Sequence, residues 1–296
     1  MKIKKTELRI REWYEHWDGL VYISFSGGKD STVLLHIARK LCPEIEAVFM
    51  DTGLEYPELR DFIKTHDNVT WIKPEMNFKD VIKKYGYPLI SKEVSRDISV
   101  ARNKPDGKTA EKFIRGSDYH KKYGDAWLLE KWDFLKDSNI PISNRCCDVM
   151  KKNPAKKYGK ETGKKPIIAT MASESRLRKK EWLTNGCNAF DKKHPSSQPM
   201  SFWTEQDVLQ YIKQFNIDYA SVYGDIEDNK GKLYMTKCDR TGCVFCAFGA
   251  HLEKEPNRFQ RLRQTHPNLW NYCMKPMSEG GLGMKEVLEY INVKYE

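Results

Sequence analysis

The feature that most constrains this fold is a short glycine-containing segment between an apolar strand and an apolar helix. Residues 20–25 are β-branched and aromatic, which predicts a strand. After the glycines, residues 31–41 are so rich in apolar side chains that the expected helix must be buried over most of its surface. A strand, a glycine turn and a buried helix are how a doubly wound α/β fold begins.

The same alternation continues along the chain. The expected strands lie at 45–50, 69–72 and 166–170, and the expected helices at 7–18, 56–65, 78–85, 91–102 and 204–215. Strands that alternate with helices predict a Rossmann-like, doubly wound parallel sheet in the α/β class. Residues 103–138 are polar but rich in aromatic side chains, so we expect a helical insertion over the site. We expect one domain over 1–235 and a cysteine-rich helical extension over 236–296.

The glycine segment has the chemistry of a phosphate-binding loop. Two glycines after a strand let several backbone N–H groups turn toward one point, and the following helix adds the positive end of its dipole. We expect Lys29 to face solvent and give its charge to the phosphates, and Asp30 to suit the helix N-terminus. The predicted nucleotide-binding residues of the loop are Ser26, Gly27, Gly28, Lys29, Asp30 and Ser31.

Asp51 follows the second expected strand, within Asp51-Thr52-Gly53. Ligand crevices of doubly wound sheets form at the carboxyl ends of the strands, next to the loop. We therefore expect Asp51 to contact Mg²⁺ or the ribose of the nucleotide. The alternative is that Asp51 only caps the following turn.

Charge and hydropathy restrict the partners and the location. The net charge is +10, and residues 145–165 carry eight basic side chains against two acidic ones. Such a stretch attracts polyanions or is a solvated helix face. No apolar run approaches the length of a membrane span, and the basic N-terminus lacks the apolar core of a secretory signal. We expect a soluble, cytoplasmic protein without a membrane partner.

The eight cysteines are expected to be free thiols or metal ligands, because thiols in a reducing compartment are seldom in disulfides. Cys243 and Cys246 are separated by two residues, so both thiolates can face one metal centre. The neighbouring Cys146 and Cys147 can do so only in a bent backbone.

Several motifs together resemble the phosphoadenosine phosphosulfate reductase family, over roughly residues 15–250. They are the phosphate loop followed by His36, Asp51-Thr52-Gly53, Arg60-Asp61-Phe62, Arg145-Cys146-Cys147, Glu174-Ser175 with Arg178, the segment 203–208 and Gly242-Cys243-Val244-Phe245-Cys246. The family has the adenine nucleotide α-hydrolase-like fold, and its members include sulfonucleotide reductases, the small subunit of ATP sulfurylase and DNA phosphorothioation enzymes. The loop resembles that of ATP pyrophosphatases, which cleave ATP to AMP and pyrophosphate.

The resemblance also implies roles for the cysteines. Cys146, Cys147, Cys243 and Cys246 resemble the ligands of a [4Fe–4S] cluster. Zn²⁺ in a four-cysteine site is the alternative, because thiolate ligands alone do not separate the two metals. Cys238 could replace one residue of the doublet.

Three departures point away from the sulfonucleotide reductases. The chain after Cys273 lacks the Glu-Cys-Gly-x-His motif that carries their nucleophile, and Cys273 lies in an aromatic context typical of a packed helix. The loop keeps Lys29, as in members that cleave ATP, and Met171 stands where many reductases have arginine.

The sequence thus predicts an ATP pyrophosphatase that adenylates an oxygen of a substrate for sulfur transfer. Lys29 and Asp51 would act at the phosphates with Mg²⁺, Arg145 and Arg178 would hold a phosphate, and Glu174 would bind the nucleotide. The acceptor is a nucleic acid (DNA or tRNA) or a small metabolite, and a sulfur-donor protein would supply the sulfur. The alternatives are a sulfonucleotide reductase and a non-catalytic nucleotide-binding partner subunit.

Overall fold

The computed structural model describes residues 1–296, which divide into two compact units. The sheet unit comprises Met1–Pro74 and Asn153–Gly242, and the cysteine unit comprises Glu75–Lys152 and Cys243–Glu296. The chain passes from one unit to the other three times, so this division differs from the boundary expected at residue 235. The insertion expected at 103–138 belongs with the C-terminal residues, in the cysteine unit.

The sheet unit contains a six-stranded sheet in the order β3-β2-β1-β5-β7-β6. β1 (Val21–Ser24) pairs in parallel with both β2 (Ala47–Met50) and β5 (Lys165–Ile168). β3 (Val69–Ile72) and β7 (Ser196–Ser197) extend the parallel sheet on either side, and only β6 (Asn188–Ala189) is antiparallel. The strand order reverses between β1 and β5, which confirms the doubly wound, Rossmann-like class and places its switch point there.

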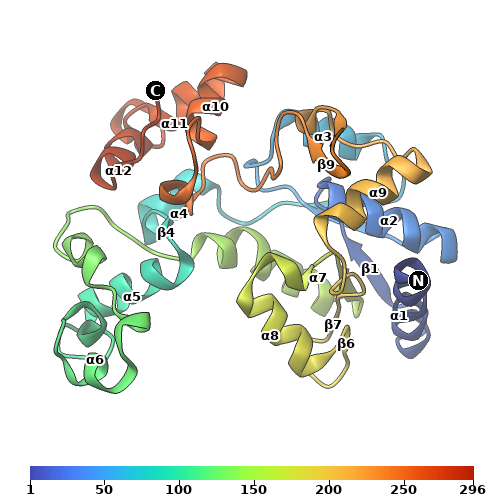
Figure 1. Cartoon of the computed structure of the whole chain (residues 1–296), viewed down its shortest axis with the longest axis horizontal. Coiled ribbons are helices and arrows are strands. Elements are labelled where there is room, and N and C mark those ends of the chain that lie inside the picture. Colours follow the sequence, from blue (N-terminus) through green and yellow to red (C-terminus); the bar gives the residue numbers. More distant parts are fainter. The chain divides into compact units, whose positions relative to one another are not determined.

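The main core lies between this sheet and three helices (Figure 1). These helices are α1 (Lys2–His16), α2 (Lys29–Leu41) and α9 (Glu205–Phe215), whose apolar faces pack with Val21 and Ile23 of β1. Tyr22, between those two residues, instead meets the ring of Tyr158 on α7 (Asn153–Thr162) at 5.3 Å. This alternation follows from the period of a strand, and it buries β1 on both faces.

The other elements of the sheet unit are helices that follow its strands and a hairpin. α3 (Pro57–Lys64) follows β2, α8 (Arg176–Asn185) follows β5, and β8 (Ile226–Asn229) forms a hairpin with β9 (Lys232–Met235). The predicted cap of α9 is confirmed, because the Thr204 hydroxyl accepts from the backbone N–H of Asp207 while the Asp207 carboxylate accepts from the N–H of Thr204.

The cysteine unit is mainly helical. Its helices are α4 (Phe78–Tyr85), α5 (Lys92–Asn103), α6 (Asp118–Tyr123), α10 (Arg258–Thr265), α11 (Pro267–Met274) and α12 (Met284–Tyr290), and β4 (Leu89–Ile90) pairs in parallel with β10 (Ala247–Phe248). The insertion contains α6 and three short 3₁₀ helices, at Ala110–Phe113, Asp125–Trp127 and Glu130–Leu135. Arg102 stabilises its end by donating to the carbonyl groups of Lys136 and Ile140.

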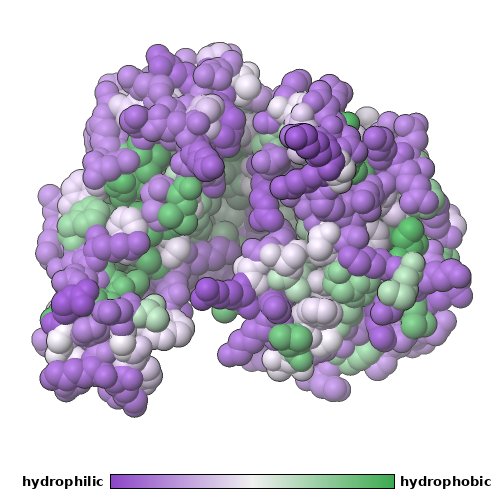
Figure 2. Space-filling model, viewed as in Figure 1, coloured by the Kyte–Doolittle hydropathy of each residue, from purple (hydrophilic) through white to green (hydrophobic).

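Hydrophilic residues cover most of the visible surface of each unit, and hydrophobic residues form smaller patches among them (Figure 2). No helix combines the length with the apolar composition that crossing a bilayer requires.

Candidate functional site

The glycine loop joins β1 to α2 at the carboxyl end of β1. Gly27 has a φ of +71°, and a side chain there would meet Ile63 of α3 at 2.9 Å, so only glycine suits this position. Gly28 caps α2 in an extended conformation. The Ser31 hydroxyl donates to the Gly28 carbonyl at 2.9 Å and accepts from the N–H of Ser26 at 3.2 Å. These bonds tie the loop to the first turn of α2.

The loop forms one wall of a cavity of about 230 Å³ within the sheet unit. The other walls come from Met171 and Glu174 after β5, from Glu205 at the start of α9, from Tyr223, and from residues 239–242. The cavity therefore lies at the switch point between β1 and β5, as the strand pattern predicts.

Lys29 does not face solvent, and that expectation was wrong. The residue is 4% exposed, its ammonium forms an ion pair with Glu205 at 2.7 Å, and it donates to the carbonyl of Asp239. It also lies 5.4 Å from the centre of the Tyr223 ring. Buried cations need such partners, because desolvation without compensation is costly. The charge of Lys29 is directed into the cavity wall, against a carboxylate that a phosphate could replace.

Two aspartates near the loop carry buried oxygens without hydrogen-bond partners. They are Oδ1 of Asp30 and Oδ1 of Asp51. Burial raises the pKa of Asp30, although Lys29 acts in the opposite direction. Asp51 directly follows β2, and its Oδ2 accepts from Arg60 at 3.0 Å. Carboxylate oxygens of this kind suit Mg²⁺, so the donor set is compatible with the metal that the sequence implies.

Glu174 organises a second group of charges at the cavity. Its carboxylate pairs with Arg178 in the first turns of α8 and with Arg240 at 3.1 Å. Burial, together with Arg240, lowers the pKa of Arg178. Of the predicted site residues, Ser26, Gly28, Lys29, Asp30 and Glu174 line the cavity, and Arg178 reaches it through Glu174. Arg145 belongs to the cysteine unit, where its guanidinium lies over the ring of Tyr85 at 5.8 Å.

Sequence reasoning did not single out Glu205, Tyr223 or Arg240 as site residues. The hydroxyl of Tyr223 lies 3.2 Å from that of Thr241, and burial raises the pKa of Tyr223 to about 12. Its ring is thus a neutral wall of the cavity. The sequence feature that could have identified Glu205 is the predicted cap of α9, which places Glu205 in the first turn of that helix.

The four predicted metal ligands all belong to the cysteine unit, whereas Cys238 belongs to the sheet unit. The Sγ atoms of Cys146 and Cys147 are 4.0 Å apart. A hydrogen bond from Cys146 lowers the pKa of Cys147, and the same interaction, with burial and the charges of Cys246 and Cys243, raises the pKa of Cys146. The sulfurs are thus close enough to interact, but no three cysteine, histidine or acidic side chains are arranged to hold a metal ion.

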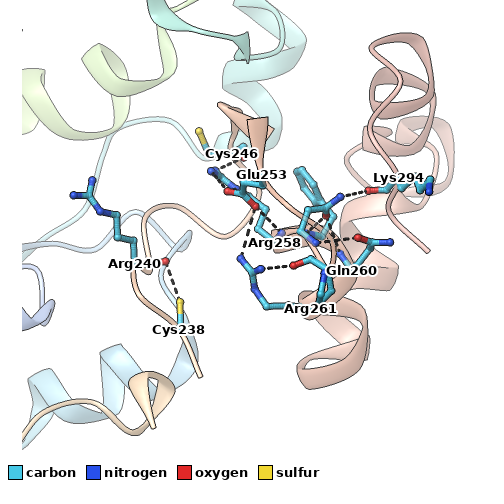
Figure 3. A network of polar contacts seen from close by, with 11 residues as sticks. Cys238, Arg240, Cys246, Glu253, Arg258, Gln260, Arg261 and Lys294 are labelled. Carbon is cyan, nitrogen blue, oxygen red and sulfur yellow. Dashed lines mark hydrogen bonds and ion pairs between the residues drawn. The ribbon is translucent and has the colours of Figure 1, made fainter. Parts of the chain in front are cut away.

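A polar network fixes the backbone around Cys246 (Figure 3). Arg258 donates to the carbonyl of Cys246 at 2.8 Å and to the Glu253 carboxylate at 2.7 Å. Burial raises the pKa of the Cys246 thiol to about 11. Arg258 and Glu253 therefore hold the backbone at Cys246 in place.

The basic stretch at 145–165 is partly structural. Lys164 pairs with Glu46 at 2.6 Å, Lys152 with Asp148 at 2.9 Å, and Lys165 lies over the ring of Trp17 at 5.0 Å. Fewer charges therefore remain for a polyanion than the sequence count suggests.

Comparison with known proteins gives one matching family model, described as the phosphoadenosine phosphosulfate reductase domain, over residues 20–88 and 67–248. An uncharacterized protein of Methanocaldococcus jannaschii is 24% identical over 97% of this chain and 56% of its own length. Sulfate adenylyltransferase subunit 2 of Caulobacter vibrioides is 29% identical over 73% of this chain and 63% of its own length. The chain thus spans little more than half the length of these relatives.

Among solved structures, a phosphoadenylyl-sulfate reductase of Candida auris in complex with phosphate gives a TM-score of 0.38 at 16% identity. The match covers 70% of this chain and 80% of that one.

Proposed function

The chain belongs to the phosphoadenosine phosphosulfate reductase domain family, and on that premise we propose that it binds ATP at the glycine loop and transfers the adenylyl group to an oxygen acceptor. The observation that carries this proposal is the cavity at the switch point, where the Lys29 ammonium binds the Glu205 carboxylate and the Asp239 carbonyl oxygen. A phosphate offers the ammonium oxygen acceptors of the same kind.

In the proposed reaction an acceptor oxygen attacks the α-phosphorus of ATP. The bond between the α-phosphorus and the bridging oxygen breaks, and that electron pair leaves with pyrophosphate. Lys29 and the loop N–H groups stabilise the charge that develops on the leaving group. Mg²⁺, to which Asp30 and Asp51 offer carboxylate oxygens, would neutralise phosphate charge. The acceptor oxygen then carries AMP. A sulfide-level sulfur from a donor protein attacks the acceptor atom that bears this oxygen, and AMP leaves with the oxygen.

Arg178 and Arg240 are proposed to hold a further anionic group. Both guanidinium groups meet on Glu174, and such planar forks suit phosphate or sulfate through paired hydrogen bonds. Arg145, which belongs to the cysteine unit, stays a proposed phosphate-binding residue in its own right.

The cysteines enter the proposal as a metal site without a catalytic step. We propose that Cys146, Cys147, Cys243 and Cys246 hold a [4Fe–4S] cluster, with Zn²⁺ as the alternative. Since these side chains are not arranged around a metal ion, binding of a cluster requires the four sulfur atoms to move closer together. Iron and zinc content of anaerobically purified protein separates the two metals.

Sulfate is the second candidate acceptor, because a relative is named sulfate adenylyltransferase subunit 2. The test compares pyrophosphate release from ATP with sulfate, with oligonucleotides and without acceptor. Acceptor-dependent release that is lost in Lys29→Met supports the proposal. Tight ATP binding without any release indicates the non-catalytic partner subunit, and sulfite formation from a sulfonucleotide indicates the reductase.

A further inference from the structure

Helix α8 is the helix of the sheet unit that buries the fewest side chains. None of its ten residues is buried, and Leu177 and Leu183 are 81% and 70% exposed. A helix of this length is marginal in water unless it packs against something. A partner that covers α8 would therefore stabilise it.

The charges of α8 specify what kind of partner suits it. Arg176, Lys179 and Lys180 are exposed within its first half, and Arg178 is paired with Glu174. Its one acidic residue, Glu181, is already paired with Lys192. A polyanion therefore complements this helix far better than a neutral or basic surface does.

Each end of α8 borders a cavity of the sheet unit. Glu174 and Ser175 lead into the helix, and Glu174 lines the phosphate-loop cavity. At the other end, Trp182 lines a groove of about 520 Å³, together with Phe190, Phe202 and the basic residues Lys5 and Arg9 of α1. Arg9 is paired within the groove to Glu12 at 2.7 Å. Aromatic rings beside cations are the usual surroundings of an unpaired base and its phosphate.

We propose that α8 and this groove bind a single-stranded nucleic acid, with backbone phosphates on Lys179 and Lys180 and one base against Trp182. Ten helical residues span about 15 Å, or about four phosphate spacings of a stacked strand. A strand bound along α8 thus extends from the groove to the phosphate-loop cavity. This inference rests on the proposed function and deepens it, because it names the acceptor and the surface that presents it.

The test measures the fluorescence anisotropy of a labelled 12-nucleotide strand added to the full-length protein across a range of salt concentrations. Neutralising two phosphate contacts in Lys179→Ala/Lys180→Ala lowers the salt slope by about 1.4 and the affinity at 0.15 M salt about tenfold. The matched control, Lys156→Ala/Lys160→Ala, removes two exposed lysines of α7 and leaves both unchanged. DNA and RNA strands of the same sequence show which sugar is preferred.

A second measurement addresses the groove. With 2-aminopurine in the strand, binding quenches its fluorescence when the base stacks on Trp182. Trp182→Ala removes the quench and weakens binding at least fivefold, whereas Trp182→Phe keeps a ring and restores most of both.

Three results would overturn the inference: equal loss in the α7 control, equal affinity for duplex and single strands, or displacement of the strand by polyglutamate at equal charge. ATP titration of the same variants separates this inference from the proposed function. Strand binding through α8 without ATP binding refutes only the function, and ATP-dependent pyrophosphate release without strand binding refutes only the inference.

Discussion

Replacing Glu205 by glutamine should make ATP bind more tightly, because Glu205 occupies Lys29 where the phosphates are proposed to lie. The ammonium and carboxylate are 2.7 Å apart, and the Lys29 side chain is buried whereas that of Glu205 is 46% exposed. At this distance two unit charges in water attract by about 1.5 kcal/mol. Ion pairs with a solvent-exposed partner contribute about 1 kcal/mol or less in measurements. Release from that competition should lower the Kd for ATP by up to about fivefold.

Isothermal titration of ATP into wild type, Glu205→Gln, Lys29→Met and the double variant measures this coupling directly. The gain from Glu205→Gln should vanish in the Lys29→Met background, since no ammonium remains to be released. Weaker ATP binding in Glu205→Gln would show that Glu205 contacts the nucleotide instead. The same gain in both backgrounds would refute competition between carboxylate and phosphate.

Three further predictions concern other parts of the chain. Burial raises the pKa of Glu46, but hydrogen bonds from Lys164 and two hydroxyl groups outweigh burial and lower that pKa. Glu46→Gln should therefore lower the unfolding free energy by about 1.5–3 kcal/mol at pH 7. Urea titrations should show this difference shrinking as the pH falls below about 4.5, because the wild-type carboxylate is then protonated. Anaerobically purified protein should be brown, and Cys243→Ser should bleach it; colourless protein with stoichiometric zinc would contradict the iron–sulfur assignment. Cys273 is fully buried and burial raises its pKa, so it should resist alkylation in the native protein, and sulfite formation from adenylylsulfate that disappears in Cys273→Ser would restore the reductase interpretation.

The central fold was predictable from local patterns. The β-branched run at β1, the glycines after it and the apolar face of α2 specify a strand, turn and helix with little help from distant residues. The cap at Thr204 likewise depends on a partner three residues away. Such short-range signals are enough to place the loop at the switch point.

The walls of the site were not predictable, because they depend on contacts between distant segments. Lys29 donates to Asp239, 210 residues further along the chain, so its burial is invisible in the local sequence. Arg240 likewise reaches Glu174 from another segment. The two-unit division arises because the chain leaves the sheet unit after Pro74 and returns at Asn153, and no change in composition marks those points.

Adenylyl transfer is tested most directly with ATP labelled at its α-phosphate, incubated with the protein, Mg²⁺ and an oligonucleotide or sulfate. The label should leave ATP as AMP or as an adenylated acceptor, with one pyrophosphate for each, and Lys29→Met should abolish this. Label recovered in ADP, or equal turnover by Lys29→Met, would contradict it.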